Sequence, residues 1–237
     1  MTCLLVTPWW HSRVPGPSAA AGSVAPTRVV DWDHPLVAGF ASRVPSGEPV
    51  DLLRSAHRLI ASAVRPVYAV EDAQPVSRTL RRGRGSCSQR LAVLEAVARA
   101  SGIPTRVRGL VVDGRFWYPR FRRLRSLVPS EVVLAWPEFR VDGGWLGVAE
   151  LFGDLASRGT CGAFTNADGE TLFDALSRTA VDWDGVTGTS CDLSARILAD
   201  LGRFSSRDEL FATHGQTLCA PSRLMADPVL GRWSPRC

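Results

Sequence analysis

Cys87 is the residue of this sequence best placed to do chemistry. It follows Gly85 and Ser86, and apolar residues within Leu91 to Ala100 lie at helical spacing from it. Because a serine can cap a helix, we expect Cys87 at a helix N-terminus, where unpaired N–H groups and the helix dipole stabilise a thiolate. A thiolate is the nucleophilic form of cysteine, and the alternative is a helix-start residue that only packs. Nearby basic side chains favour the thiolate too: Arg82, Arg84 and Arg90.

The segments around Cys87 predict the elements that would position it. Residues 49–64 have the apolar spacing of an amphipathic helix, which Pro66 ends. Residues 76–85 are polar, basic and contain glycine, so we expect a loop there. Three strands are expected, the last two joined by a turn at Asp142-Gly143-Gly144: residues 105–112, 131–141 and 145–151.

Taken in order, several of these motifs resemble the transglutaminase-like superfamily. Gly85-Ser86-Cys87 before a helix resembles the family's cysteine segment, and Ser101-Gly102-Ile103-Pro104-Thr105-Arg106-Val107 its G-I-P-x-R approach to the sheet. The run from Ala135 to Trp145 looks like the family hairpin H-A-W-x-E-x-x-x-x-G-x-W. Asp33-His34-Pro35 and the helix after it look like the usual N-terminal approach. The resemblance runs from about residue 31 to 152, roughly half of the chain.

The resemblance implies an α+β, papain-like core in which the helix carrying the cysteine packs on an antiparallel sheet. In the family, that sheet carries a histidine and an acid. The implied chemistry is acyl transfer: the cysteine attacks an amide or ester carbonyl to form a thioester, the histidine moves the proton, and the acid orients the histidine. Members include protein crosslinkers, peptidases, amidases and acyl transferases of natural-product pathways. No cofactor or metal is expected.

This sequence departs from the family pattern at two positions. The family histidine directly precedes Ala-Trp, and here that residue is Leu134. The family aspartate falls at Ala149. Leucine cannot accept a proton and alanine cannot orient an imidazole, and general-base assistance is worth roughly 10²–10⁴ in rate. Glu150, beside the acid position, would point to the opposite face of a regular strand, which makes it a poor substitute.

Four histidines and a few other side chains remain as substitutes. His214 is the best of them, because the C-terminal segment can fold back over the site. We expect His57 to face solvent on the flank of its helix and His34 to be a turn residue, and His11 falls in the N-terminal lead-in. Supporting roles near the cysteine or on the hairpin fall to Ser86, Gln89, Trp136 and Glu138.

Charge is unevenly distributed along the chain, and every one of its 28 basic residues is arginine. Residues 78–125 hold 13 arginines and two acids, a balance of 13 − 2 = +11, whereas residues 126–237 balance at 9 − 15 = −6. A solvated loop, nucleic acid, an anionic surface or an acidic protein would each fit the basic block, but no nucleic-acid motif accompanies it. The simplest interpretation is a solvated loop; among partners, we favour an acidic carrier protein that brings an acyl or peptide substrate. The densest part of the block is Arg120, Arg122, Arg123 and Arg125.

The chain divides into three parts by composition. Residues 1–27 form a flexible lead-in, 28–152 the transglutaminase-like core, and 153–237 a helical accessory extension packed on the core. Trp183 and Trp233 are expected to anchor the extension. Its predicted helices cover residues 167–176, 193–202 and 206–212.

The N-terminus lacks the pattern of a secretion signal, and no apolar run reaches the roughly 18–20 residues that cross a bilayer. We therefore expect a cytoplasmic protein with reduced thiols and no membrane partner. No cysteine pair has the C-x-x-C spacing of a structural zinc site. The six cysteines are Cys3, Cys87, Cys161, Cys191, Cys219 and Cys237.

Two functions are compatible with these residues. One is a cysteine-dependent acyl-transfer or amide-bond enzyme with a non-standard site, acting in a bacterial biosynthetic pathway. The other is a pseudoenzyme, a transglutaminase-like fold used for binding or scaffolding, which Leu134 and Ala149 favour. We favour the enzyme, because a scaffold does not require Cys87 at a helix start surrounded by arginines.

Overall fold

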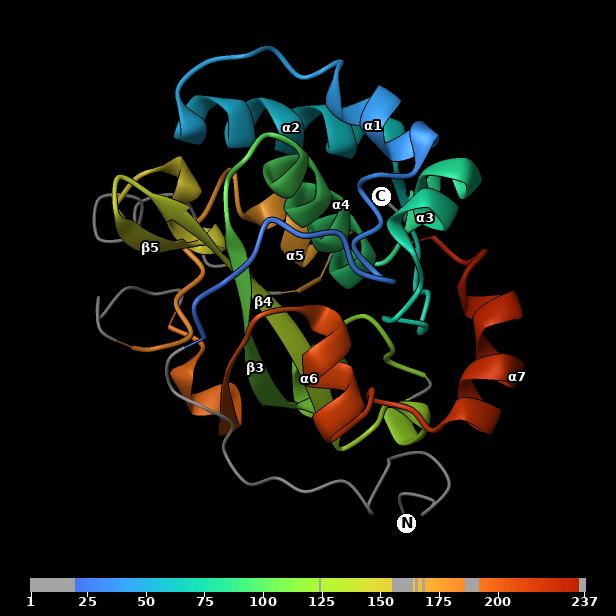
Figure 1. Ribbon diagram of the computed structural model, residues 1–237. Coiled ribbons are helices and arrows are strands. Elements are labelled where there is room, and N and C mark those ends of the chain that lie inside the picture. Colours follow the sequence, from blue (N-terminus) through green and yellow to red (C-terminus); the bar gives the residue numbers. More distant parts are fainter. Residues whose placement is uncertain are drawn as a thin grey trace.

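The computed structural model describes residues 20–123, 125–154, 164, 166–167, 169–185 and 192–234. Its centre is the helix α4 (Cys87–Ala100), packed against a four-stranded sheet with the strand order β5-β4-β3-β6. The helices α1 (Pro35–Ala41) and α2 (Pro49–Ala63) cover the other side of α4 (Figure 1). This mixture of helices and an antiparallel sheet confirms the expected α+β class.

The segment expected as a loop at residues 76–85 is instead the helix α3 (Val76–Arg82), so that prediction was wrong. Val76 and Thr79 are buried, and α3 packs on α4. The many arginines of this segment made its apolar helical face hard to recognise in the sequence. That face is buried because α3 packs on α4. Gly83, at φ 58°, ends the helix in the left-handed region, and Gly85 belongs to a two-residue bridge in which β1 (Arg65–Pro66) pairs with β2 (Arg84–Gly85).

Three of the strands follow the expected antiparallel pattern: β3 (Thr105–Asp113), β4 (Glu131–Val141) and β5 (Gly144–Gly147). Asp142 and Gly143, at φ 51° and 79°, make the predicted tight turn between β4 and β5. The predicted strand 145–151 is wrong in its second half, because Val148–Phe152 forms a 3₁₀ helix. Glu150 lies in that helix and accepts a hydrogen bond from the Gly147 backbone N–H at 2.6 Å, so an alternating strand face does not apply to it.

The extension completes the sheet, which the sequence did not predict. Residues 193–202 were expected to be helical, but Ile197–Phe204 forms β6, antiparallel to β3. Leu201 and Phe204 are buried there, and pairing with β3 satisfies backbone groups that a helix would have satisfied internally. The expected helix 206–212 is confirmed as α6 (Arg207–His214), and 167–176 shrinks to α5 (Leu172–Ala175). A further helix, α7 (Ala220–Leu230), was not predicted.

Both tryptophans of the extension contact the core as expected. The Trp183 ring lies 5.7 Å from that of Trp136, and the Trp233 ring 5.4 Å from that of Tyr68. At the other end of the chain, residues 20–27 do not behave as a loose lead-in, because Ser23 and Thr105 exchange two backbone hydrogen bonds. Among the described residues, no helix combines the length and apolarity needed to span a membrane. His11, Cys3, Cys161, Cys191 and Cys237 lie outside the described residues.

Candidate active site

Cys87 is the first residue of α4 and is half-buried. The Ser86 hydroxyl accepts a hydrogen bond from the Gln89 N–H at 3.2 Å, and the Gln89 side chain accepts one from the Ser86 N–H at 3.1 Å. This reciprocal capping box fixes the start of the helix. Ser86 and Gln89, expected as supporting residues, thus position the backbone around the cysteine.

The positions that the resemblance assigns to the histidine and the acid are apolar and buried. Leu134 lies in β4 opposite Leu110 of β3 and is 5% exposed. Ala149 lies in the 3₁₀ helix after β5 and is also 5% exposed. Both belong to the main hydrophobic cluster, against which Cys87 packs.

Arg207, the first residue of α6, joins the cysteine helix to β4. Its guanidinium donates to the Ser88 hydroxyl at 2.9 Å, to Glu95 Oε1 at 2.6 Å and to the Ala135 carbonyl at 3.4 Å. One buried side chain thereby bridges the neighbour of Cys87 and the neighbour of Leu134. The start of α4 and the middle of β4 therefore both contact one guanidinium, and residue 134 on β4 is leucine.

Burial dominates the electrostatics of this bridge. Arg207 and Glu95 are both fully buried. Burial raises the pKa of the Glu95 carboxyl, and the charges of Arg207 and Arg99 oppose that rise. Sequence reasoning missed Arg207 because it lies 119 residues from Ser88, and no local pattern marks it as a partner of α4.

An acidic residue that the sequence did not single out lies in a loop that contacts the start of α4. Asp72 is in the loop between β1 and α3, where Gln89 donates to the Glu71 carbonyl at 2.8 Å and the Asp72 N–H donates to the Gln216 side chain at 2.7 Å. Burial raises the Asp72 pKa to about 6, and Glu71 acts in the same direction. Ser88 and the charges of Arg207 and Arg223 act on this pKa in the opposite direction. The hint in the sequence was an acidic pair within a short loop before the cysteine segment.

His57 was expected to face solvent, and that prediction was wrong. The side chain is 2% exposed and its ring stacks on Phe173 of α5 at 4.2 Å. Its Nε2 lies 2.7 Å from the Phe173 carbonyl oxygen, which sets Nε2–H as the donor. Burial is the largest cause of its lowered pKa. Phe173 of α5 and Phe152, whose ring centre lies 5.0 Å from that of His57, cover this flank of α2.

The other two described histidines, His34 and His214, contact residues that belong to helix capping and core packing. His34 caps α1, because its Nδ1 accepts a hydrogen bond from the Leu36 N–H at 3.1 Å. His214 is the last residue of α6, is 5% exposed and packs its ring against that of Phe204 at 5.4 Å.

Glu138 and Trp136 are engaged in packing and ion pairs on β4. Glu138 is buried between Arg106 of β3 and Arg203 of β6 and pairs with both. Trp136 contacts Trp183 edge to face. Trp136 lies two residues from Leu134, so both side chains point to the same side of β4.

The chain's central segment matches a known family. Residues 40–149, just under half of the chain, match the model of the transglutaminase-like superfamily. These residues form a transglutaminase-like core. The match includes Cys87, α4 and the β4–β5 hairpin, and it ends at Ala149, before the segments that carry β6 and Arg207.

Other comparisons add less. No curated protein matches the chain. Among solved structures, a proposed cysteine protease from Cytophaga hutchinsonii is similar to it with a TM-score of 0.45 and 12% sequence identity. That alignment covers 78% of this chain but 47% of the other, so this chain spans about half the length of its structural neighbour.

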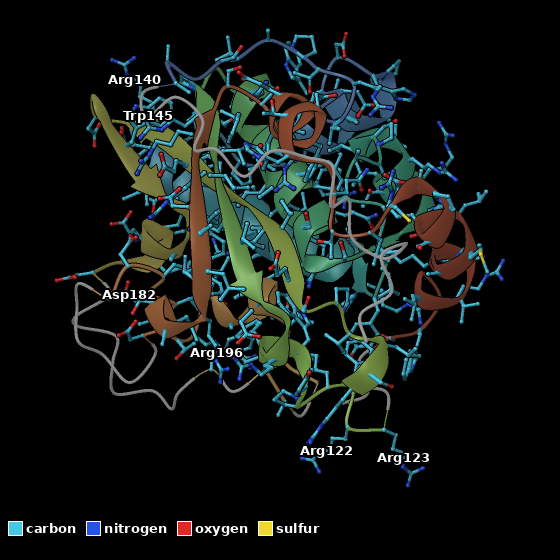
Figure 2. The ribbon with its side chains drawn as sticks, turned by 90° about the horizontal axis from the view of Figure 1, so that it is seen from below. Arg122, Arg123, Arg140, Trp145, Asp182 and Arg196 are labelled. Atoms are coloured by element: carbon cyan, nitrogen blue, oxygen red, sulfur yellow. The ribbon has the colours of Figure 1, made fainter. Side chains whose placement is uncertain are left out.

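The basic block of the transglutaminase-like core serves several purposes. Arg90 is buried and pairs with Asp174 of α5, and buried Arg99 donates to the Thr105 hydroxyl. Arg120 donates to Asn166 at 2.5 Å. Arg122 and Arg123 are exposed, and Figure 2 shows both projecting away from the body of the protein. Arg125 is also exposed, and its guanidinium carbon lies 5.7 Å from the centre of the Tyr118 ring.

The described part of the transglutaminase-like core and its extension offers no cluster of three or more histidine, cysteine or acidic side chains arranged to hold a metal ion. The polar groups that contact each other beside Cys87 are the Ser88 hydroxyl and the Arg207 guanidinium. Both can donate hydrogen bonds to a negatively charged group.

Proposed function

We propose that this protein is a cysteine-dependent enzyme of acyl transfer or amide-bond chemistry, in which Cys87 forms a thioester intermediate. The carrying observation is the placement of a half-buried thiol at the capped start of α4, where Arg207 donates to the hydroxyl of the next residue, Ser88. A helix N-terminus favours the thiolate through its unpaired N–H groups.

The proposed reaction has two halves. The Cys87 sulfur attacks the carbonyl carbon of an amide or ester, a carbon–sulfur bond forms, and the alcohol or amine leaves with a proton. Water or a second amine then attacks the thioester and releases the thiol. Backbone N–H groups at the start of α4 are suited to stabilise the oxyanion of each tetrahedral intermediate.

A binding or scaffolding role is the second candidate. The observation that favours it is the apolar packing of Leu134 and Ala149. In that case Cys87 would be a packing residue, and the protein would bind a partner without catalysing a reaction.

Alkylation of Cys87 separates the two candidates. The native protein is treated with iodoacetamide at pH 7, and each cysteine-containing peptide is followed by mass spectrometry. If the protein is an enzyme, iodoacetamide should label Cys87 at least tenfold faster than Cys219, which is 4% exposed. A Cys87 that stays unlabelled until the protein is unfolded would support the scaffold instead.

A thioester can be trapped in the same preparation. We expect incubation with small acyl thioesters to add one acyl group to the intact mass, and Cys87→Ala to abolish the addition. Circular dichroism of the variant checks that its fold is retained. If Cys87→Ala acquires the same acyl mass as the wild type, Cys87 is not the nucleophile.

We further propose that the acyl group arrives on an acidic carrier protein, as in a bacterial biosynthetic pathway. Exposed Arg122 and Arg123 support this, because a protruding basic pair can steer an acidic partner. Arg122→Glu/Arg123→Glu should weaken binding of an acyl carrier protein at low salt at least tenfold. The matched control, Arg78→Glu/Arg81→Glu, changes two exposed arginines of α3 and should bind like the wild type. Equal affinities in all three proteins would contradict this docking site.

A further inference from the structure

The helix α7 turns its charged side chains toward the protein. The Arg223 guanidinium donates to Glu71 at 2.9 Å, and the Asp227 carboxylate accepts a hydrogen bond from the Val70 N–H at 3.2 Å. A surface helix of a globular protein normally does the reverse and packs its apolar stripe on the core. The charged residues of α7 therefore attach it to the protein, and its apolar residues face outward.

The outward face of α7 is strongly exposed. Leu224 and Met225 are 78% and 79% exposed, and Val229 is 68% exposed. Figure 1 shows α7 at the outer edge of the molecule. From Pro221 onward, the exposed residues follow the i, i+3, i+4, i+7, i+8 spacing of a helix that packs on a partner. The structure describes every residue of α7, and those exposed are all apolar: Ala220, Pro221, Leu224, Met225, Pro228 and Val229.

An aromatic cluster flanked by arginines lies at the end of this face. The Trp233 ring, just beyond α7, lies 5.4 Å from the Tyr68 ring and 5.8 Å from the Phe121 ring. The Tyr68 and Phe121 rings are 4.8 Å apart, so the cluster joins α7 to the loop after β3. Trp233 is 37% exposed. The exposed residues that adjoin the cluster in sequence are Arg122, Arg123 and Arg232.

The aromatic cluster is also joined to the segment that leads to Cys87. The Tyr68 N–H donates to the Trp233 carbonyl at 3.1 Å. The N–H of its neighbour Val67 donates to the Gly85 carbonyl, also at 3.1 Å. Because Gly85 precedes Cys87 by two residues, a partner bound at the cluster lies on the side of the protein where α4 begins.

The charges around the α7 face select its occupant. A second copy related by a two-fold axis would place the same arginines on both sides of the contact, and like charges repel. An interfacial membrane helix uses basic residues of its own polar face, whereas Arg223 is paired with Glu71. An acidic protein complements both features, since its apolar side chains can pack on α7 and its carboxylates can pair with the arginines.

We propose that the outward face of α7 and the aromatic cluster at its end form the docking surface for an acidic acyl carrier protein. This inference rests on the function proposed above, because it concerns how the acyl group reaches Cys87. The Cys87 sulfur attacks the carbonyl carbon of the carrier's thioester, and a new carbon–sulfur bond forms. The carbon–sulfur bond to the carrier breaks, and the carrier leaves as a thiol with the proton that Cys87 gave up. Docking raises the effective concentration of the thioester and takes no part in the exchange.

Two acyl donors separate docking from chemistry. The full chain receives a butyryl group either from butyryl acyl carrier protein or from the small thioester butyryl-N-acetylcysteamine, and intact mass follows the acylation of Cys87. In Leu224→Gln/Val229→Gln, the ratio of the carrier rate to the small-thioester rate should fall at least tenfold. The matched control is Leu36→Gln/Leu198→Gln, which changes two leucines that are 41% and 52% exposed on α1 and β6. Its ratio should equal that of the wild type.

Three further measurements identify any other occupant of the α7 face. We expect Leu224→Gln/Val229→Gln to leave the thermal midpoint, the size-exclusion profile and the retention on phosphatidylserine vesicles unchanged. A lower midpoint would show that another part of this chain covers the face. A dimer that becomes a monomer would show that a second copy covers it, and lost vesicle binding would show that a membrane does. Each of these three results would overturn the docking proposal.

The outcomes for this surface and for Cys87 are separable. If the carrier acylates the wild type and Leu224→Gln/Val229→Gln with the same rate ratio, the docking surface is wrong and the proposed function stands. If the small thioester acylates Cys87 but the carrier never does, carrier docking is wrong and the chemistry of Cys87 again stands. If neither donor acylates wild-type Cys87, the proposed function fails and this inference fails with it.

Discussion

Arg207 donates to the Ser88 hydroxyl at 2.9 Å, so a residue of the extension contacts the residue beside the candidate nucleophile. The same guanidinium also pairs with Glu95, which lies further along α4. The segment beyond the family match is therefore part of the site's construction. Four properties of the molecule can be predicted from such contacts.

Replacing Arg207 with methionine should destabilise the protein by about 3–5 kcal/mol, because it leaves the Glu95 charge buried without its partner. Within the part of the chain that the structure describes, the second oxygen of Glu95 has no hydrogen-bond partner to compensate. Chemical denaturation followed by tryptophan fluorescence measures the change. The double variant Arg207→Met/Glu95→Leu should recover much of the loss, and a double variant no more stable than Arg207→Met would contradict the pairing argument.

His57 should make the stability fall in acid. Its pKa is lowered in the folded protein, mainly by burial, so the unfolded chain binds a proton more readily. The contribution of His57 to the free energy of unfolding is fully present above the ordinary histidine pKa of about 6.5. It is lost as the pH falls below that value. The slope for one proton approaches about 1.4 kcal/mol per pH unit. The free energy of unfolding, measured from pH 7.5 to 5, gives the slope.

His57→Gln is the matched control, because glutamine offers an N–H to the Phe173 carbonyl but does not titrate. The wild type also contains Asp72, whose raised pKa acts in the opposite direction over part of this range. The difference between wild type and His57→Gln isolates the histidine. Parallel profiles for the two proteins would show that His57 is not the group responsible.

Gly114→Ala should destabilise the protein by about 1–3 kcal/mol, through overpacking where the chain leaves β3. A Cβ at this position would lie 1.7 Å from the Pro129 carbonyl oxygen, which is backbone and cannot rotate away. Gly39→Ala provides the comparison, since nothing lies within 4 Å of its added Cβ and Gly39 is in α1. That variant should be neutral or slightly stabilising. Thermal unfolding midpoints test both, and equal midpoints would refute the steric argument.

A fragment ending at residue 152 should not fold as a stable monomer. It lacks β6, which leaves one edge of β3 unpaired, and it lacks Arg207, which leaves Glu95 uncompensated. We expect aggregation or a loss of cooperative unfolding relative to the full chain, measured by size-exclusion chromatography and calorimetry. A monomeric fragment with a sharp transition would show that the transglutaminase-like core is self-sufficient.

Local patterns predicted the parts of this molecule that local interactions determine. The capping box at Ser86 and Gln89 and the turn at Asp142 and Gly143 involve residues a few positions apart, so their sequence signals were sufficient. The burial of His57 depends on Phe173, 116 residues away. No periodicity within α2 encodes that contact.

The candidate site shows the same division. Cys87 was identified from its own neighbourhood, whereas Arg207 reaches the site through a contact with Ser88, 119 residues away. The strand β6 was mistaken for a helix for a related reason. Its apolar residues fit either spacing over a short run, and the free edge of β3 decides between them.

The pairing of β6 with β3 also implies an order of events during protein synthesis. The nucleophile, its helix and three strands leave the ribosome first, and the fourth strand, Arg207 and Gln216, which binds the Asp72 N–H, emerge later. A nascent chain therefore carries Cys87 well before it can complete the surroundings of that thiol. The surroundings of Cys87 can form only after residues 197–216 have been synthesised, which delays any reactivity of the cysteine until then.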